Sequence, residues 1–165
     1  MERLEEAVIS ENPAPPRDGR PWTPWALLFA RLVLGLIFFM AGLHKVFVLT
    51  PAGHVEKWFF PYRDTFLPVW SLWAAGLAIP FVELAGGALL LVGWRIREAL
   101  VALGAVLVVV TFGHLLKESL YPFHEHVIPR LALLLFLLVM GPEDDRYSVD
   151  GMRRSRKNSR CGEIV

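Results

Sequence analysis

The chain of 165 residues contains one cysteine, 17 Lys and Arg against 16 Asp and Glu, and 55% hydrophobic residues. That 55% leaves out 13 glycines, whereas soluble domains reach only about 45–50% with glycine included. The composition excludes disordered, collagen-like and disulfide-stabilised proteins. The length predicts a single domain, and the net charge of +1 gives no reason to expect a nucleic-acid partner.

The first 24 residues precede any long apolar block. They begin with an acidic stretch, which is not the start of a secretory signal peptide. The part from Asn12 to Pro24 contains five prolines, a composition typical of an extended linker. We therefore expect residues 1–24 to form a proline-rich cytoplasmic segment.

Four long apolar blocks follow, and each is long enough to cross a bilayer as a helix. About 20 residues at 1.5 Å per residue span the hydrocarbon layer. A soluble bundle would show charged outward faces at helical spacing, and barrel strands would alternate every second residue. Neither pattern is present, so residues 25–141 are predicted to be an all-α, polytopic membrane four-helix bundle. The predicted spans are residues 25–48, 69–94, 99–116 and 122–140.

The basic residues outside the spans are unevenly distributed. Eleven lie in the N-terminal segment, the connection after the second span and the tail, whereas three lie in the other two connections. The positive-inside rule then places both termini in the cytoplasm. The basic tail, residues 142–165, is expected to be mobile. Its charges either fix the topology alone or also contact anionic lipid.

The connection from Thr50 to Pro68 is rich in aromatic residues. Such residues gather where lipid meets water, so an interfacial loop or a short helix is expected there. An alternative is that this connection covers a cavity between the helices.

Ionisable residues inside the spans are candidates for function, because a charge at that depth costs several kcal/mol unless it is paired or hydrated. At about 100° per residue, these residues share helix faces with small ones. The faces are Arg31, Gly35, Gly42 and Lys45 on the first span, Gly76, Pro80, Glu83 and Gly87 on the second, and Gly104, Thr111, His114 and Glu118 on the third. Such faces pack helices closely, and they also permit a shared polar cavity.

The depth of Glu83 in its helix predicts that it pairs with Arg130 or with Arg31. The pair could be purely structural and fix the register of the helices. Without a partner the carboxyl would stay protonated and could carry a proton. His124, Glu125 and His126 are possible metal ligands together with His114, but His-x-His on a helix points the two rings about 200° apart. No metal site is predicted.

Several short motifs in a fixed order make the chain resemble the DoxX family of small four-helix membrane proteins. The resemblance covers roughly residues 24–150. The motifs are Arg31 to Lys45 (RLVLGLIFFMAGLHK), Pro80 to Gly87 (PFVELAGG), Gly113-His114, Arg130 to Leu135 (RLALLL), Gly141-Pro142 and Tyr147 to Asp150 (YSVD). The family's polar positions would fall on Arg31, Lys45, Glu83, His114 and Arg130.

Members of the family are similar to a subunit of a thiosulfate:quinone oxidoreductase and to membrane partners of redox proteins, so the resemblance implies a bacterial or archaeal plasma-membrane protein. The leading hypothesis is a quinone-linked subunit of a membrane oxidoreductase complex, with a bound quinone as its one expected cofactor. The chain itself supplies no redox centre, so electrons would come from a partner protein. The alternatives are a non-enzymatic membrane scaffold or assembly subunit of a larger complex, and a small-solute transporter. The expected partners are membrane or redox proteins, or further copies of the chain in a homo-oligomer.

Overall fold

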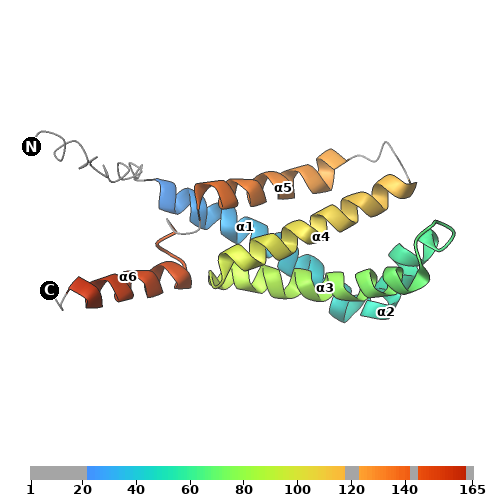
Figure 1. Cartoon of the computed structure of the whole chain (residues 1–165), viewed down its shortest axis with the longest axis horizontal. Coiled ribbons are helices and arrows are strands. Elements are labelled where there is room, and N and C mark those ends of the chain that lie inside the picture. The colour runs from blue at the N-terminus through green and yellow to red at the C-terminus, as the bar shows by residue number, and fades with distance from the viewer. Residues whose placement is uncertain (1–21, 118–122, 142–144, 163–165) are drawn as a thin grey trace, which may run out of the picture.

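The structure, a computed structural model, describes residues 22–117, 123–141 and 145–162. The predicted N-terminal segment, except residues 22–24, and Glu118 lie outside this part. Four long helices run side by side (Figure 1). The helices are α1 (Thr23–Leu43), α2 (Pro51–His54), α3 (Val69–Val92), α4 (Ile96–Lys117), α5 (Phe123–Met140) and α6 (Val149–Gly162). Short π-helical turns, His44–Val48 and Val55–Phe59, and a 3-10 turn, Phe60–Tyr62, complete the connection from α1 to α3.

The all-helical prediction is confirmed over the described residues, which contain no strand. Three helical segments are long and apolar enough to cross a membrane: Thr23–Val48, Val69–Val92 and Ile96–Leu116. They match the first three predicted spans within three residues at every boundary. The fourth predicted segment is also helical, as α5. That α5 crosses the bilayer, and that the termini are cytoplasmic, stay predictions.

The four long helices form a ring in the order α1, α3, α4, α5, and the most extensive contact joins α1 to α3. Two glycines bring these two backbones together. A methyl group added at Gly42 would lie 2.7 Å from the Cα of Leu84, and one at Gly87 would lie 2.7 Å from the Cα of Phe39. Both distances are too short for carbon atoms, so the predicted glycine faces do serve close helix packing.

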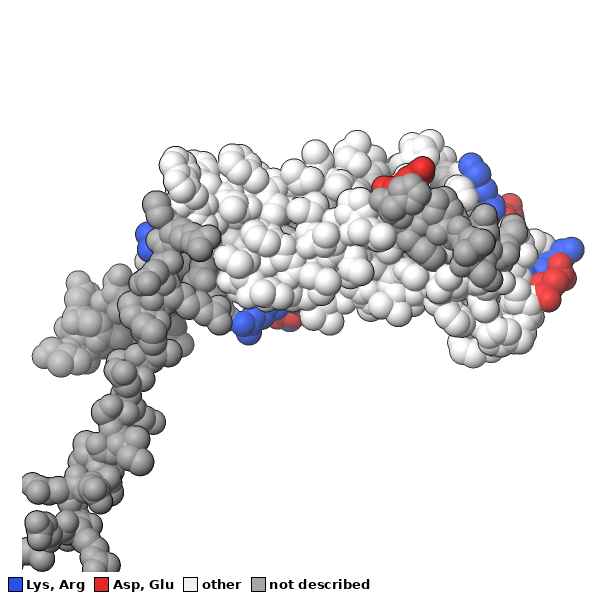
Figure 2. All heavy atoms as spheres, turned by 90° about the horizontal axis from the view of Figure 1, so that it is seen from above, with Lys and Arg blue, Asp and Glu red and all other residues white. Residues whose placement is uncertain are grey.

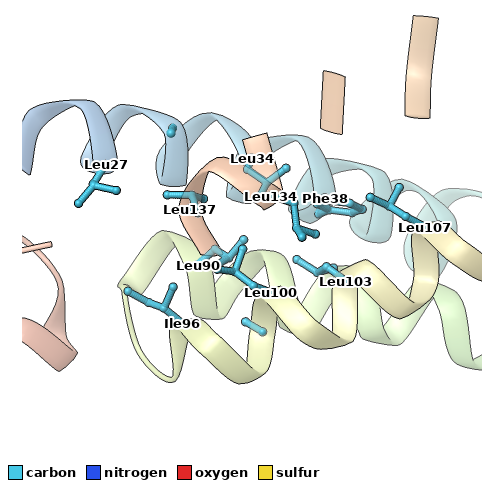
Figure 3. Close-up of a cluster of buried hydrophobic side chains, with 12 residues drawn as sticks. Leu27, Leu34, Phe38, Leu90, Ile96, Leu100, Leu103, Leu107, Leu134 and Leu137 are labelled. Atoms are coloured by element: carbon cyan, nitrogen blue, oxygen red, sulfur yellow. The ribbon is translucent and has the colours of Figure 1, made fainter. Parts of the chain in front are cut away.

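A hydrophobic core fills the half of the bundle nearest α6, which we call the α6 end (Figure 3). It extends from Leu27 and Ile96 near that end to Phe38 and Leu107 near the middle of the bundle. Each long helix contributes to it. The opposite end, where the α1–α3 connection with α2 lies, is called the α2 end (Figure 1).

The outer surface of the bundle is apolar along much of its length. Phe29 on α1 is 60% exposed and Val139 on α5 is 75% exposed. Both side chains lie on the outer face of their helix. Figure 2 shows one long side of the molecule, on which uncharged atoms predominate and charged side chains gather toward the ends. Such a surface is suited to lipid rather than to water.

The prediction of a mobile tail is wrong for the segment Asp145 to Asp150. Asp145 and Ser148 are buried, and Asp150 accepts a hydrogen bond from the backbone N–H of Ile96 at 3.1 Å. The backbone N–H of Asp150 in turn donates to the Gly93 carbonyl at 3.1 Å. Gly93 has a φ of +75° and leaves no room for a side chain beside Ser148, as the left-handed end of a helix requires. The segment therefore locks the turn between α3 and α4.

Candidate functional site

A cavity of about 370 Å³ lies between the four long helices in the half of the bundle nearest the α2 end. Along the long helices the residues that line the cavity lie mostly nearer the α2 end than the residues of the hydrophobic core do. On α1 the core ends at Phe38 and the cavity begins at Ala41, and on α5 the cavity residue Arg130 precedes the core residue Leu134. The core therefore closes the cavity toward the α6 end.

The cavity wall is largely apolar, with a few ionisable and aromatic side chains. This is the usual character of a small-molecule site. The apolar lining is Ala41, Ile79, Val106, Leu107, Val109, Val110, Gly113 and Val127, and the polar and aromatic lining is Lys45, His54, Trp58, Phe59, Tyr62, Glu83, His114, His126 and Arg130. Four of the five predicted site residues are among them.

Glu83 pairs with Lys45, which corrects the prediction of Arg130 or Arg31 as its partner. Lys45 Nζ donates to Glu83 Oε2 at 2.6 Å. The Glu83 side chain is 3% exposed and the Lys45 side chain is 24% exposed, so the pair joins a buried carboxylate to a more accessible amine. Lys45 can reach Glu83 because α1 continues past Leu43 as the π-helical turn and crosses α3 closely at Gly42.

Arg130 faces the same cavity from α5 without an ion pair among the described residues. Its guanidinium carbon lies 5.7 Å from the centre of the ring of Phe38, a residue of the hydrophobic core. A cation over an aromatic face is attracted by the ring quadrupole, but the ring does not neutralise the charge. Arg130 and Glu83 are thus brought to one cavity and still do not pair.

His114 and His54 both line the cavity, and each donates a hydrogen bond to a backbone carbonyl. His114 Nδ1–H donates to the Val110 carbonyl at 2.7 Å, within α4. His54 Nδ1–H donates to the Gly76 carbonyl of α3 at 2.9 Å. In the neutral ring each Nε2 is then a hydrogen-bond acceptor. No three His, Cys, Asp or Glu residues of the described chain are grouped as metal ligands.

The aromatic connection covers the α2 end of the cavity, which was the alternative interpretation of its sequence. His54 and Val55 are buried, and Trp58, Phe59 and Tyr62 line the cavity. Val55 and Phe59 pack on Gly76, where an added methyl group would lie 2.7 Å from Val55. The chain can settle this closely on α3 because position 76 has no side chain.

His54 should make the protein less stable in acid. Burial lowers its pKa from the ordinary value of 6.5, and the nearby Lys45 acts in the same direction, while the Gly76 carbonyl and Glu83 oppose the shift. The stability contributed by neutral His54 is present above pH 6.5 and is lost as pH falls through the folded-state pKa. We expect the midpoint temperature of thermal unfolding to decrease when the pH is lowered from about 7.5 to about 5.5. This decrease should be smaller in the His54→Asn variant and unchanged in the His126→Gln variant. An equal decrease in the native protein and in both variants would contradict the role of His54.

Arg31, the fifth predicted site residue, does not line the cavity. It lies at the α6 end, where its Nε donates to Asp145 Oδ2 at 2.7 Å. Its Nη1 donates to the carbonyls of Leu90 and Leu91, the latter at 3.0 Å, and its Nη2 donates to the Tyr147 carbonyl at 3.5 Å. The residue is 2% exposed. Arg31 therefore joins α1, the end of α3 and the segment that follows α5.

The sequence did not single out three residues that matter here. His54 was not among the predicted site residues, yet it lines the cavity. Trp58 and Tyr62 belong to the aromatic connection, which was expected first of all at the membrane interface, since an aromatic at a span boundary usually lies there. The hydrophobic residues interleaved in residues 54–62 could have suggested a buried face.

The comparisons agree with the resemblance of the motifs. The DoxX family model matches residues 26–115 of the 165, from the start of α1 to the end of α4. The match contains Lys45, Glu83 and His114 of the cavity and ends before Arg130. Comparisons with curated proteins and with solved structures gave no match. Because the model covers more than half of the chain, and three helices are suited to crossing a bilayer, this integral membrane protein belongs to the DoxX family.

Proposed function

We propose that this DoxX protein is a quinone-binding subunit of a membrane oxidoreductase complex. The observation that carries the proposal is the convergence of Lys45, Glu83, His114 and Arg130 on one largely apolar cavity. A quinone head group is an apolar ring with two carbonyl oxygens that accept hydrogen bonds. The apolar wall suits the ring, and the cavity supplies donors for the oxygens from Lys45 and Arg130.

The Lys45 and Glu83 pair supplies a route for protons. Reduction of a quinone consumes two electrons and two protons, and oxidation of the quinol releases them. The electrons pass to or from a redox protein bound to this subunit. The protons pass through the pair, because Glu83 is buried beside the cavity while Lys45 is partly exposed toward the α2 end. The hydrophobic core blocks the route toward the α6 end.

Tryptophan fluorescence offers a direct test, because quinones quench the indole ring at short range. We expect a naphthoquinone to quench the protein in lipid nanodiscs with saturation at low micromolar concentration, on the order of the affinity of small metabolites for their sites. Trp58 lines the cavity, whereas Trp70 is 74% exposed and is not part of its lining. The Trp58→Phe variant should lose much of the saturable quenching, and Trp70→Phe should keep it.

Two outcomes would remove the proposal. One is quenching that never saturates and is equal in both tryptophan variants, since it would report quinone dissolved in the lipid. The other is an unchanged rate of quinone reduction by the purified complex after Glu83→Gln.

The scaffold alternative is favoured by one observation, the direct contact between Lys45 and Glu83. Such a pair can serve to fix the helices without a ligand. The cavity beside the pair argues for a ligand, because a purely structural pair needs no void next to it. Saturable binding that depends on Trp58 separates the two functions, since a scaffold gives none.

A further inference from the structure

Among the described residues that line the cavity, the ionisable side chains leave one positive charge without a counter-charge. Glu83 is the only acidic residue of the described lining, and Lys45 neutralises it at 2.6 Å. Arg130 has the Phe38 ring as its neighbour, and it takes part in none of the ion pairs of the described residues. The cavity therefore carries a net charge of about +1 while its histidines are neutral.

An arginine in this position cannot escape the cost of its charge by losing a proton. Its guanidinium stays protonated at every physiological pH. Arg130 is seven residues from the first residue of α5 and ten from the last, which is about 10–15 Å along the helix from each end. Arg130 is half-buried, and much of the cavity wall beside it is apolar.

We propose that Arg130 is an anion-binding residue and that the cavity takes its ligand in ionised form. Resting on the proposed function, this names the ligand class as a quinone with an acidic ring hydroxyl. The ionised oxygen accepts hydrogen bonds from the guanidinium, whose charge makes these bonds shorter and stronger than those to a neutral carbonyl. The ring of the ligand lies against the apolar wall formed by Val106, Val110 and Val127.

The Lys45 and Glu83 pair makes the site selective for a single negative charge. With Glu83 already paired, Arg130 is the one cation of the described cavity lining that is left to neutralise. A neutral quinone would leave Arg130 uncompensated, and a ligand with two negative charges would leave one of them unpaired in an apolar cavity. Arginine is better suited to this role than lysine, because its planar fork can hold two neighbouring oxygen atoms of one ring.

Two ligands that share a ring system test the proposal. Lawsone is a naphthoquinone with a ring hydroxyl that is ionised at neutral pH, and unsubstituted naphthoquinone is its neutral counterpart. In nanodiscs at neutral pH, quenching titrations should give a Kd for lawsone that is lower by about tenfold or more, as a charge-assisted contact predicts. The Arg130→Gln variant should lose this preference, and Arg130→Lys should keep part of it.

Arg63→Gln is the matched control, because Arg63 is an exposed cation of the α1–α3 connection outside the cavity lining. It should keep the full preference. The Kd of the neutral naphthoquinone in Arg130→Gln reports whether the cavity is intact. Equal affinity for the two ligands in the native protein, or a preference that survives Arg130→Gln, overturns the inference and leaves the proposed function standing. Binding of neither ligand overturns both.

Discussion

Replacement of Arg31 by leucine should lower the free energy of unfolding by about 3–5 kcal/mol, which is the cost of breaking a buried ion pair from one side. The variant would leave the Asp145 carboxylate buried without its 2.7 Å partner. It would also remove the donor to the carbonyls of Leu90 and Leu91 at the end of α3. Those carbonyls carry the negative end of the helix dipole, so they lose a favourable cation as well.

Unfolding of the purified protein in detergent, followed by tryptophan fluorescence, measures this effect. The double variant Arg31→Leu, Asp145→Leu should recover much of the loss, because it leaves no charge unpaired. Arg95→Gln is the control, since it breaks an ion pair with Glu98 in which both side chains are more than half exposed. That variant should show no measurable change. An Arg31→Leu variant with the same free energy of unfolding as the native protein would contradict the proposed role of Arg31. That role is to join α1, the end of α3 and the segment that follows α5.

Alanine at Gly42 or at Gly87 should destabilise the protein by about 1–3 kcal/mol, because each added methyl group forces α1 and α3 apart. At Gly42 the methyl carbon would meet the Cα and Cβ of Leu84 at 2.7 and 2.9 Å. At Gly87 it would meet the Cα of Phe39 and the carbonyl oxygen of Gly35 at 2.7 and 2.9 Å. These are backbone atoms or atoms next to the backbone, so no side-chain rotation relieves the overlap.

The matched control is Gly104→Ala on α4, where the added methyl would lie 3.7 Å from Leu134, an ordinary contact. Alanine restricts the unfolded chain more than glycine does and favours a helix, so Gly104→Ala should be neutral or stabilising by about 0.4–1 kcal/mol. The same unfolding measurement compares the three variants. If Gly104→Ala proved as harmful as Gly42→Ala, the assignment of α1 and α3 as the closest pair would be wrong.

The long helices could be predicted because each is specified locally. An apolar run of about 20 residues has one satisfactory backbone conformation in a bilayer, and that run is visible in the sequence. The glycine faces at Gly42 and Gly87 were also predictable, since residues that repeat at helical spacing share a face. The packing of Asp145 to Asp150 was not predictable in this way, because it depends on Arg31, 114 residues away, and no periodicity connects the two.

The partner of Glu83 could not be predicted from helical spacing alone. The depth of a residue in its helix gives its height in the bundle, but it does not give the rotation of one helix against another. Arg130 reaches the cavity as expected, yet its side chain lies by Phe38, whereas Lys45 crosses from α1 to Glu83. Arg31 has the right charge but is held at the α6 end by Asp145. Four of the five polar residues singled out in the sequence lie at one cavity, but their pairing could not be predicted.

A structure of the protein determined in lipid with its native quinone pool is the most direct test of the account. We predict ligand density in the cavity between Arg130, Glu83 and His114, with an oxygen atom within hydrogen-bonding distance of the Arg130 guanidinium. The Lys45 to Glu83 contact should remain beside it. A cavity closed by rearranged side chains, with Arg130 paired to a carboxylate of the chain, would contradict the proposal that this site binds a ligand.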